Sequence, residues 1–163
     1  MSNIQKKHDY INAVWQLCQA NSGTGANHLH TYPVWASALE VEGHNVAGWI
    51  ALPRYGECSN LNGIVFVNQA RNTAVILGTS NNQGDHIKIG AKNSAQNEVI
   101  YVGACAKQAT VISEITNCAV IVVAETETAH MVRKLAEDGL CPKNIIIFSN
   151  SKNLNHAQLI AEQ

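Results

Sequence analysis

Glu98-Val-Ile-Tyr-Val102 begins the stretch of sequence that decides the fold, and this stretch runs on to Asn150. Two further apolar runs lie within it, Cys118-Ala-Val-Ile-Val-Val123 and Asn144-Ile-Ile-Ile-Phe148. Each run has the length and composition of a buried parallel strand. Between the runs, residues suited to a buried helix face recur at three- and four-residue spacing: Ala109, Ile112 and Thr116, then Ala129, Val132 and Ala136. This alternation predicts two right-handed βαβ units that share a strand, and therefore a parallel sheet flanked by helices.

The second predicted helix has signals at both ends. Thr126 is a candidate N-cap with Glu127 in the first turn, where an acidic side chain favours the helix dipole. At the other end, Asp138-Gly-Leu-Cys-Pro142 has the form of a glycine C-cap followed by a proline stop. We therefore expect this helix to begin after Thr126 and to end at Gly139.

The residues before this block predict a helix and then an antiparallel meander. The helix runs to about Ala20, and one stripe of it carries Ile4, Ile11, Val14, Trp15 and Cys18. Short apolar runs then alternate with polar turns, and the predicted strands are residues 49–52, which stop at Pro53, 63–67, 73–77 and 86–89. A polar link at residues 91–97 predicts a division into a helix and β-meander subdomain, residues 1–96, and a βαβαβ core, residues 97–163. The predicted fold class is α/β.

The composition narrows the classes of protein that fit. A chain of 163 residues with 46% hydrophobic residues and no apolar run of membrane-spanning length predicts a soluble domain with a substantial core. The net charge of −1 provides no overall field toward nucleic acid or an anionic membrane, so any such binding must be local. The five cysteines include no C-x-x-C pair, and the first residues lack the pattern of a secretory signal, which predicts reduced thiols in the cytoplasm.

Three histidines, His28, His30 and His44, suggest a metal site in the first third of the chain. We favour the alternative that these side chains belong to a polar surface, because no Asp, Glu or Cys stands beside them at a recognised ligand spacing. No metal and no cofactor is therefore expected.

The order of these parts resembles the Toprim-containing primases of phages and plasmids. The resemblance is collinear over about Asn27 to Asn150, and its segments before the βαβαβ block are His30-Thr-Tyr-Pro-Val-Trp35, Ile50-Ala-Leu-Pro53, Asn62-Gly-Ile-Val-Phe66 and Lys88-Ile-Gly90. In that family one strand ends in a Glu-Gly pair, and here Gly103 is kept while Val102 replaces the acid. The last family strand carries two acids separated by one residue, and here Ser149 and Ser151 hold both positions.

These substitutions decide what the resemblance implies about chemistry. The Toprim centre uses a glutamate as general acid or base and an aspartate pair to hold Mg²⁺, which prefers carboxylate oxygens. Valine neither titrates nor ligates a metal, and neutral serines are poor magnesium ligands. The resemblance therefore implies a degenerate, non-catalytic Toprim domain, with a short tail at residues 155–162 where the family continues.

Such a domain is expected to be an accessory protein of mobile-element DNA replication or transfer that binds single-stranded DNA or a replication protein. The residues proposed to contact nucleic acid are Trp35, Arg54, Tyr55, Arg71, Lys88 and Lys92, which combine stacking rings with cations. The alternative is that these are isolated solubilising charges on turns. A homo-oligomer or protein partner at the tail is a further possibility, through Leu154, Leu159 and Ile160.

Two other functions stay open. A small-ligand or nucleotide-binding module would use residues at the carboxyl ends of the parallel strands, namely Gly103, Glu125, Glu127, Ser149 and Asn150. We favour the alternative that Glu127 supports the helix dipole and that Ser149 and Asn150 begin a loop. A cysteine-dependent enzyme would use Cys105 at a helix start with His86 or His130 as base, although packing between helix and sheet is the simpler role for this thiol.

Overall fold

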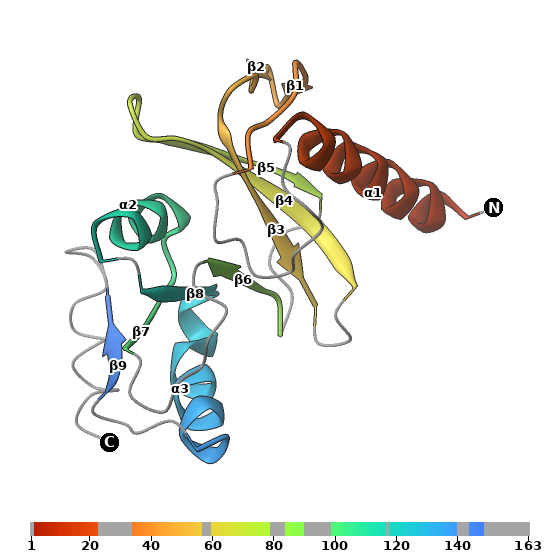
Figure 1. The fold of residues 1–163 in the computed structure, drawn as a ribbon. Helices are drawn as coiled ribbons and strands as arrows, with labels where there is room; N and C mark the ends of the chain where they lie inside the picture. Colours follow the sequence, from red (N-terminus) through yellow and green to blue (C-terminus); the bar gives the residue numbers. More distant parts are fainter. Residues whose placement is uncertain are drawn as a thin grey trace.

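Seven strands form one mixed sheet in the order β5-β4-β3-β6-β8-β7-β9, seen in the computed structural model of Figure 1. The structure describes residues 2–22, 34–56, 60–78, 84–89, 99–116, 118–139 and 144–148. The strands of this sheet are β3 (Ile50–Tyr55), β4 (Leu61–Asn68), β5 (Thr73–Gly78), β6 (His86–Ile89), β7 (Ile100–Gly103), β8 (Ala119–Val123) and β9 (Ile145–Ile147). A small antiparallel sheet pairs β1 (Glu40–Val41) with β2 (His44–Asn45). The chain is therefore an α/β protein, as the sequence predicts.

The end of the chain contains the predicted parallel strands and their helices. β7 pairs in parallel with β8 on one side and with β9 on the other. Helix α2 (Ala106–Thr116) connects β7 to β8, and α3 (Thr128–Glu137) follows β8. The sheet is not parallel throughout, because β6 pairs antiparallel with β8. Since β7 lies between β8 and β9, these two strands are not neighbours, which the sequence did not indicate.

The start of α3 differs from the prediction, whereas its end agrees. A 3₁₀ turn, η1 (Glu125–Glu127), comes first, and Glu127 takes the N-cap position without a side-chain capping bond. The Glu127 amide donates to the Ala124 carbonyl at 2.8 Å, which is the i to i+3 hydrogen bond of a 3₁₀ turn. Thr126 lies inside this turn and is therefore not the N-cap of α3. Gly139 has a φ of +98° and closes the helix as expected.

The antiparallel meander is also present, but β3 continues through Pro53 to Tyr55 instead of stopping there. The amide of Ala51 donates to the Val34 carbonyl at 2.8 Å, on the side of β3 that faces away from β4. Backbone groups two residues apart point the same way along a strand, so the nitrogen of Pro53 also faces away from β4. Its missing N–H therefore removes no bond to β4, and the strand tolerates the proline.

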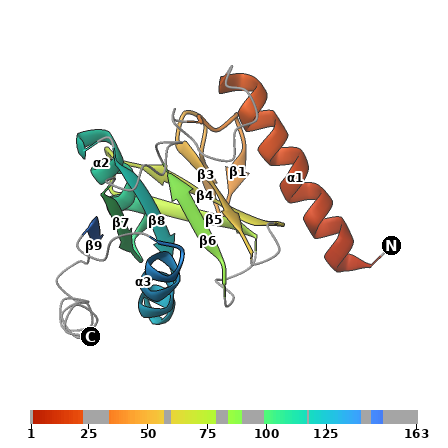
Figure 2. The same cartoon turned by 60° about the horizontal axis from the view of Figure 1, so that its bottom comes forward.

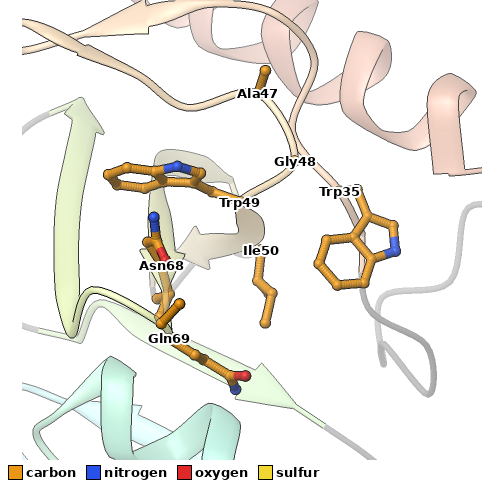
Figure 3. Close-up of a pocket in the computed structure, with 9 residues that line it drawn as sticks. Trp35, Ala47, Gly48, Trp49, Ile50, Asn68 and Gln69 are labelled. Atoms are coloured by element: carbon orange, nitrogen blue, oxygen red, sulfur yellow. The ribbon is translucent and has the colours of Figure 1, made fainter.

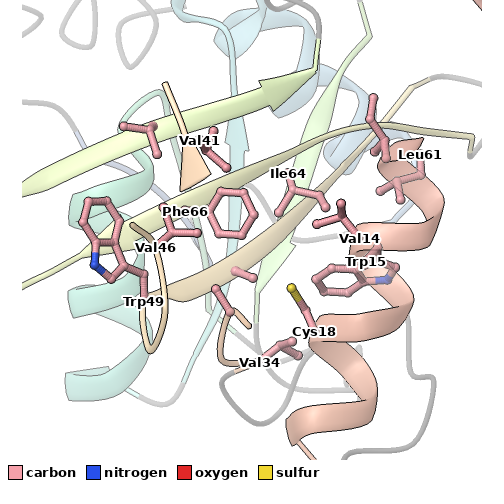
Figure 4. Close-up of a cluster of buried hydrophobic side chains, with 14 residues drawn as sticks. Val14, Trp15, Cys18, Val34, Val41, Val46, Trp49, Leu61, Ile64 and Phe66 are labelled. Carbon is pink, nitrogen blue, oxygen red and sulfur yellow. The ribbon is translucent and has the colours of Figure 1, made fainter. Parts of the chain in front are cut away.

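Helices cover both faces of the sheet. Helix α1 (Asn3–Ser22) packs Ile11, Val14 and Cys18 against Ile64 and Phe66, which confirms its predicted apolar stripe at the described positions (Figure 4). Figure 2 shows α1 at the β3–β5 end of the sheet and α2 and α3 near β7 and β8. None of the described helices combines the length and the hydrophobicity that a membrane span requires.

The alternation of side chains along the strands places α2 on the face opposite α1 and α3. Along β3, Ala51 belongs to the cluster under α1, whereas Ile50 and Leu52 belong to the cluster that contains Ala109 of α2. Along β8, Ile121 packs with α3 residues, whereas its neighbours Val120 and Val122 pack on the α2 side. We call the side covered by α2 the α2 face.

One sheet runs across the expected subdomain division at residues 96 and 97. β6 lies before that division and pairs with β8 after it through four residue pairs, from His86↔Val123 to Ile89↔Val120. The pairing between β3 and β6 is much shorter and consists of Tyr55↔His86 alone. The sparsest pairing in the sheet therefore lies between β3 and β6.

Candidate nucleic-acid interface

Two tryptophans line a pocket of about 370 Å³ close to α2 (Figure 3). Trp35 comes from the segment before β1, and Trp49 comes from the turn that leads into β3. The opposite wall comes from the end of β4 and the turn after it, with Asn68 and Gln69. Figure 3 shows the two indole rings on either side of Ile50, above the two amide side chains.

Strand-like pairing turns Trp35 outward. The amide of Ala36 donates to the Trp49 carbonyl at 2.7 Å, and Trp35 forms an isolated antiparallel bridge with Ile50. Val34 and Ala36 on either side are buried, so the extended backbone directs the intervening Trp35 away from the core. The side chain is 46% exposed, an unusual environment for the largest apolar residue.

Trp49 is held more firmly than Trp35. The turn before it places Gly48 at a φ of +77°, a conformation that favours glycine, and the Trp49 amide donates to the Val46 carbonyl at 2.9 Å. Its indole packs in the core under α1 and against the ring of His44, with ring centroids 5.7 Å apart. Only 9% of the residue is exposed, so Trp49 forms a rigid wall of the pocket.

The two amides at the polar side of the pocket are oriented by hydrogen bonds. Asn68 Oδ1 accepts from the Arg71 amide at 3.2 Å, and Gln69 Nε2 donates to Thr110 Oγ1 of α2 at 3.0 Å. Each amide thus keeps one group that these bonds do not use, the donor Asn68 Nδ2 and the acceptor Gln69 Oε1. A donor and an acceptor beside aromatic rings suit the edge and the face of a nucleic-acid base.

Two cations stand next to this polar side. Arg71 is exposed in the turn between β4 and β5, directly after Ala70, which lines the pocket. Lys107 reaches the same turn from α2, where its Nζ donates to the Asn72 carbonyl at 3.3 Å. Sequence reasoning missed Lys107. The available signal was a lysine, and no acid, in the first turn of a helix, which opposes the helix dipole.

The structure corrects the position of Arg54, which the sequence placed on the nucleic-acid surface. Arg54 is only 2% exposed, and its Nε lies 3.7 Å from Asp85 Oδ2. The residue opposite it on β4 is Gly63, whose missing side chain leaves room for the guanidinium. Tyr55 is half-buried against the core under α1, and burial raises the pKa of its hydroxyl. Neither side chain is placed to contact a nucleic acid together with Trp35.

The remaining predicted contacts divide between the two faces of the sheet. Lys88 is exposed on β6, but it alternates with Ile87 and Ile89, which pack on the α2 face. Its side chain therefore leaves from the opposite face, away from the tryptophan pocket. Lys92 lies outside the described residues. Of the predicted set, Trp35 lines the pocket, and Arg71 directly follows Ala70, another lining residue.

The strands that precede the predicted ligand residues are not neighbours in the sheet, although the sequence predicted them to be. Glu125 is exposed and Glu127 half-buried in η1 after β8, whereas the strand that precedes Ser149 and Asn150 is separated from β8 by β7. Ser149, Asn150 and Ser151 themselves lie outside the described residues. Adjacent strands are about 4.8 Å apart, so β8 and β9 are separated by about twice that distance.

Packing explains why a glycine occupies position 103, and the side chain of Val102 is inaccessible to solvent. A Cβ atom on Gly103 would lie 2.6 Å from ring atoms of Phe148, so the glycine provides the space that this ring occupies. Val102 is 0% exposed and packs with Ile121 and Val123. The surroundings of Val102 are therefore apolar.

The described residues bring no catalytic or metal-binding group together around the predicted histidines and cysteine. No cluster of three or more His, Cys, Asp or Glu side chains occurs in the described part of the chain, and His28 and His30 lie outside it. Cys105 is half-buried beside α2, whereas His130 is exposed on α3 at the other face of the sheet. His86 Nδ1 lies 3.0 Å from the Gly84 carbonyl. His86 alternates with Ile87 on β6, so its side chain leaves from the face opposite α2, as that of His130 does.

The interface is thus a pocket with an exposed aromatic ring at Trp35, a buried one at Trp49 and two amides, and two cations stand beside it. Comparisons with protein-family models, with curated proteins and with solved structures found no match to this chain.

Proposed function

We propose that this chain binds single-stranded DNA without catalysing a reaction, as an accessory protein in the replication or transfer of mobile-element DNA. The observation that carries the proposal is the exposed indole of Trp35 at a pocket shared with Trp49, with Arg71 and Lys107 beside it. One base would stack on Trp35, and the amides of Asn68 and Gln69 would contact its edge. The adjacent phosphates would lie at the two cations.

The energetics of this arrangement predict weak, salt-sensitive binding. Stacking of a base on an aromatic side chain contributes about 1–3 kcal/mol. Two phosphate contacts on a single strand predict a slope of about −1.4 for log K against log salt concentration. The overall charge of −1 adds no long-range attraction, so affinity should depend on the pocket and these two cations alone.

Two observations support the non-catalytic part of the proposal. Under the Toprim resemblance, the position of the general acid or base is Val102, which is fully buried among apolar side chains. The acids near the strand ends, exposed Glu125 and half-buried Glu127, belong to a turn after β8. Mg²⁺ is therefore expected to leave DNA binding unchanged apart from its contribution to ionic strength.

The test is fluorescence anisotropy of a labelled oligo-dT with the wild-type protein and with Trp35→Ala, at low and physiological salt. Loss of stacking should weaken binding by about 5- to 150-fold, the equivalent of 1–3 kcal/mol. Trp35→Phe keeps an aromatic face and should recover part of the affinity. The matched control is Tyr10→Ala, which removes an exposed aromatic ring, 52% accessible, from α1.

Equal losses in the Trp35→Ala and Tyr10→Ala variants would show that the pocket does not bind the strand. No binding of the wild-type protein at low salt would exclude the DNA function and leave a replication protein as the partner to seek. Replacement of both Arg71 and Lys107 by alanine should flatten the salt dependence toward zero.

A further inference from the structure

A second cavity, of about 320 Å³, lies on the α2 face between the central strands and the start of α2. Its floor is apolar and comes from four strands, with Val65 of β4, Ile76 of β5, Ile87 of β6 and Val122 of β8. The volume lies at the lower end of the range for small-molecule sites, which are mostly apolar with a few fixed polar groups.

A buried ion pair forms one wall. Arg54 and Asp85 line the cavity and are 2% and 3% exposed, with Nε and Oδ2 3.7 Å apart. Asp85 Oδ1 accepts from Asn62 Nδ2 at 2.8 Å, and Asn62 Oδ1 accepts from Asn60 Nδ2 at 2.7 Å. The register of β3 and β4 shifts between Arg54 and Tyr55, a bulge of the kind that redirects side chains at functional sites. The pair is therefore held in place from three segments of the sheet.

The charges at this cavity favour an anion. Two cations, Arg54 and Lys107, line it against a single carboxylate, Asp85, whose two oxygens already face Asn62 and Arg54. Burial lowers the pKa of the Arg54 guanidinium, and the Asp85 charge only partly opposes this effect. A second negative charge nearby would stabilise the charged guanidinium further. The first turn of α2, which contains no acid, adds its amide dipoles on the same side.

We infer that this cavity binds a small organic carboxylate, with its apolar body on Ile87 and Val122 and its charged group at Arg54 and Lys107. The apolar floor disfavours inorganic anions, which would leave that floor unfilled. A neutral compound of the same shape would lack the attraction to the net positive charge of the wall. Apart from Lys107, which is also one of the two cations beside the tryptophan pocket, the residues that line this site differ from those of that pocket.

Methyl NMR of the full chain tests the inference with benzoate as the probe, benzamide as its neutral counterpart and inorganic phosphate as an anion without an apolar body. Benzoate should shift the methyl resonances of Ile87 and Val122, with affinity about tenfold or more above that of benzamide. Phosphate should leave these methyl resonances unchanged. Absence of shifts at millimolar benzoate, or equal affinity for benzoate and benzamide, would overturn the assignment.

Two variants locate the site without touching the buried ion pair. Ala74→Phe adds a ring at an exposed position that lines the cavity and should abolish benzoate binding, whereas Ala13→Phe makes the same change on the exposed side of α1 and should not. Lys107→Ala should reduce the preference for benzoate over benzamide, with Lys134→Ala on α3 as its charge-matched control. Benzoate shifts that survive Ala74→Phe in a folded protein would contradict the inference.

Discussion

At the residue scale, the arginine at position 54 shows how one buried contact changes the role of a side chain. The sequence placed Arg54 among the predicted cations of a nucleic-acid surface, but Asp85 and the small Gly63 make a buried ion pair possible. Arg54→Met should lower the free energy of unfolding by about 3–5 kcal/mol, since it leaves the carboxylate of Asp85 buried without its cation. The double variant Arg54→Met/Asp85→Asn should recover most of this loss, because no uncompensated charge remains. Urea unfolding measures both, and Lys88→Met at an exposed position should change stability by less than about 0.5 kcal/mol. A double variant no more stable than the single one would show that the pair contributes through packing instead.

At the scale of the element, the sequence predicted the end of helix α3 correctly and its start incorrectly. Its glycine stop was predictable, because Gly139 at a φ of +98° needs the conformational freedom that glycine has. Its N-cap was not, because the 3₁₀ turn from Glu125 to Glu127 depends on how the chain leaves β8. Gly139→Ala should therefore cost about 1 kcal/mol of unfolding free energy through backbone strain alone, since an added Cβ there has no atom within 4 Å. Thr126→Ala should cost well under the typical value of about 1 kcal/mol for a lost N-cap. Thermal or urea unfolding of the two variants decides this, and a full capping loss at Thr126 would contradict the structure.

At the scale of the whole molecule, periodicity predicted the strands and helices but not how they meet. The apolar runs of β7, β8 and β9 were readable because buried parallel strands need nearly continuous apolar residues. The order of the strands could not be predicted, since β6, which pairs with β8, has the alternating pattern of any half-buried strand. The sequence predicted one part of the tryptophan pocket, because Trp35 is an aromatic residue in a polar stretch. It did not predict Asn68 and Gln69, which come from a distant hairpin. Contacts between distant segments leave little local signal, and both cavities depend on such contacts.

The same long-range contacts predict that the chain unfolds as one unit, although a polar link divides its sequence. The cluster on the α2 face unites Leu52 and Val67 from before the link with Val120 and Val122 from after it, and β6 is paired to β8 along its whole length. Separation of the two parts would expose this shared core, which opposes independent unfolding. Urea unfolding can be followed by the fluorescence of Trp15, Trp35 and Trp49, all of which precede the link, and by hydrogen exchange of peptides from β7 and β8. The two midpoints should coincide. A lower midpoint for β7 and β8 would instead establish two units, joined weakly where β3 meets β6 at Tyr55 and His86.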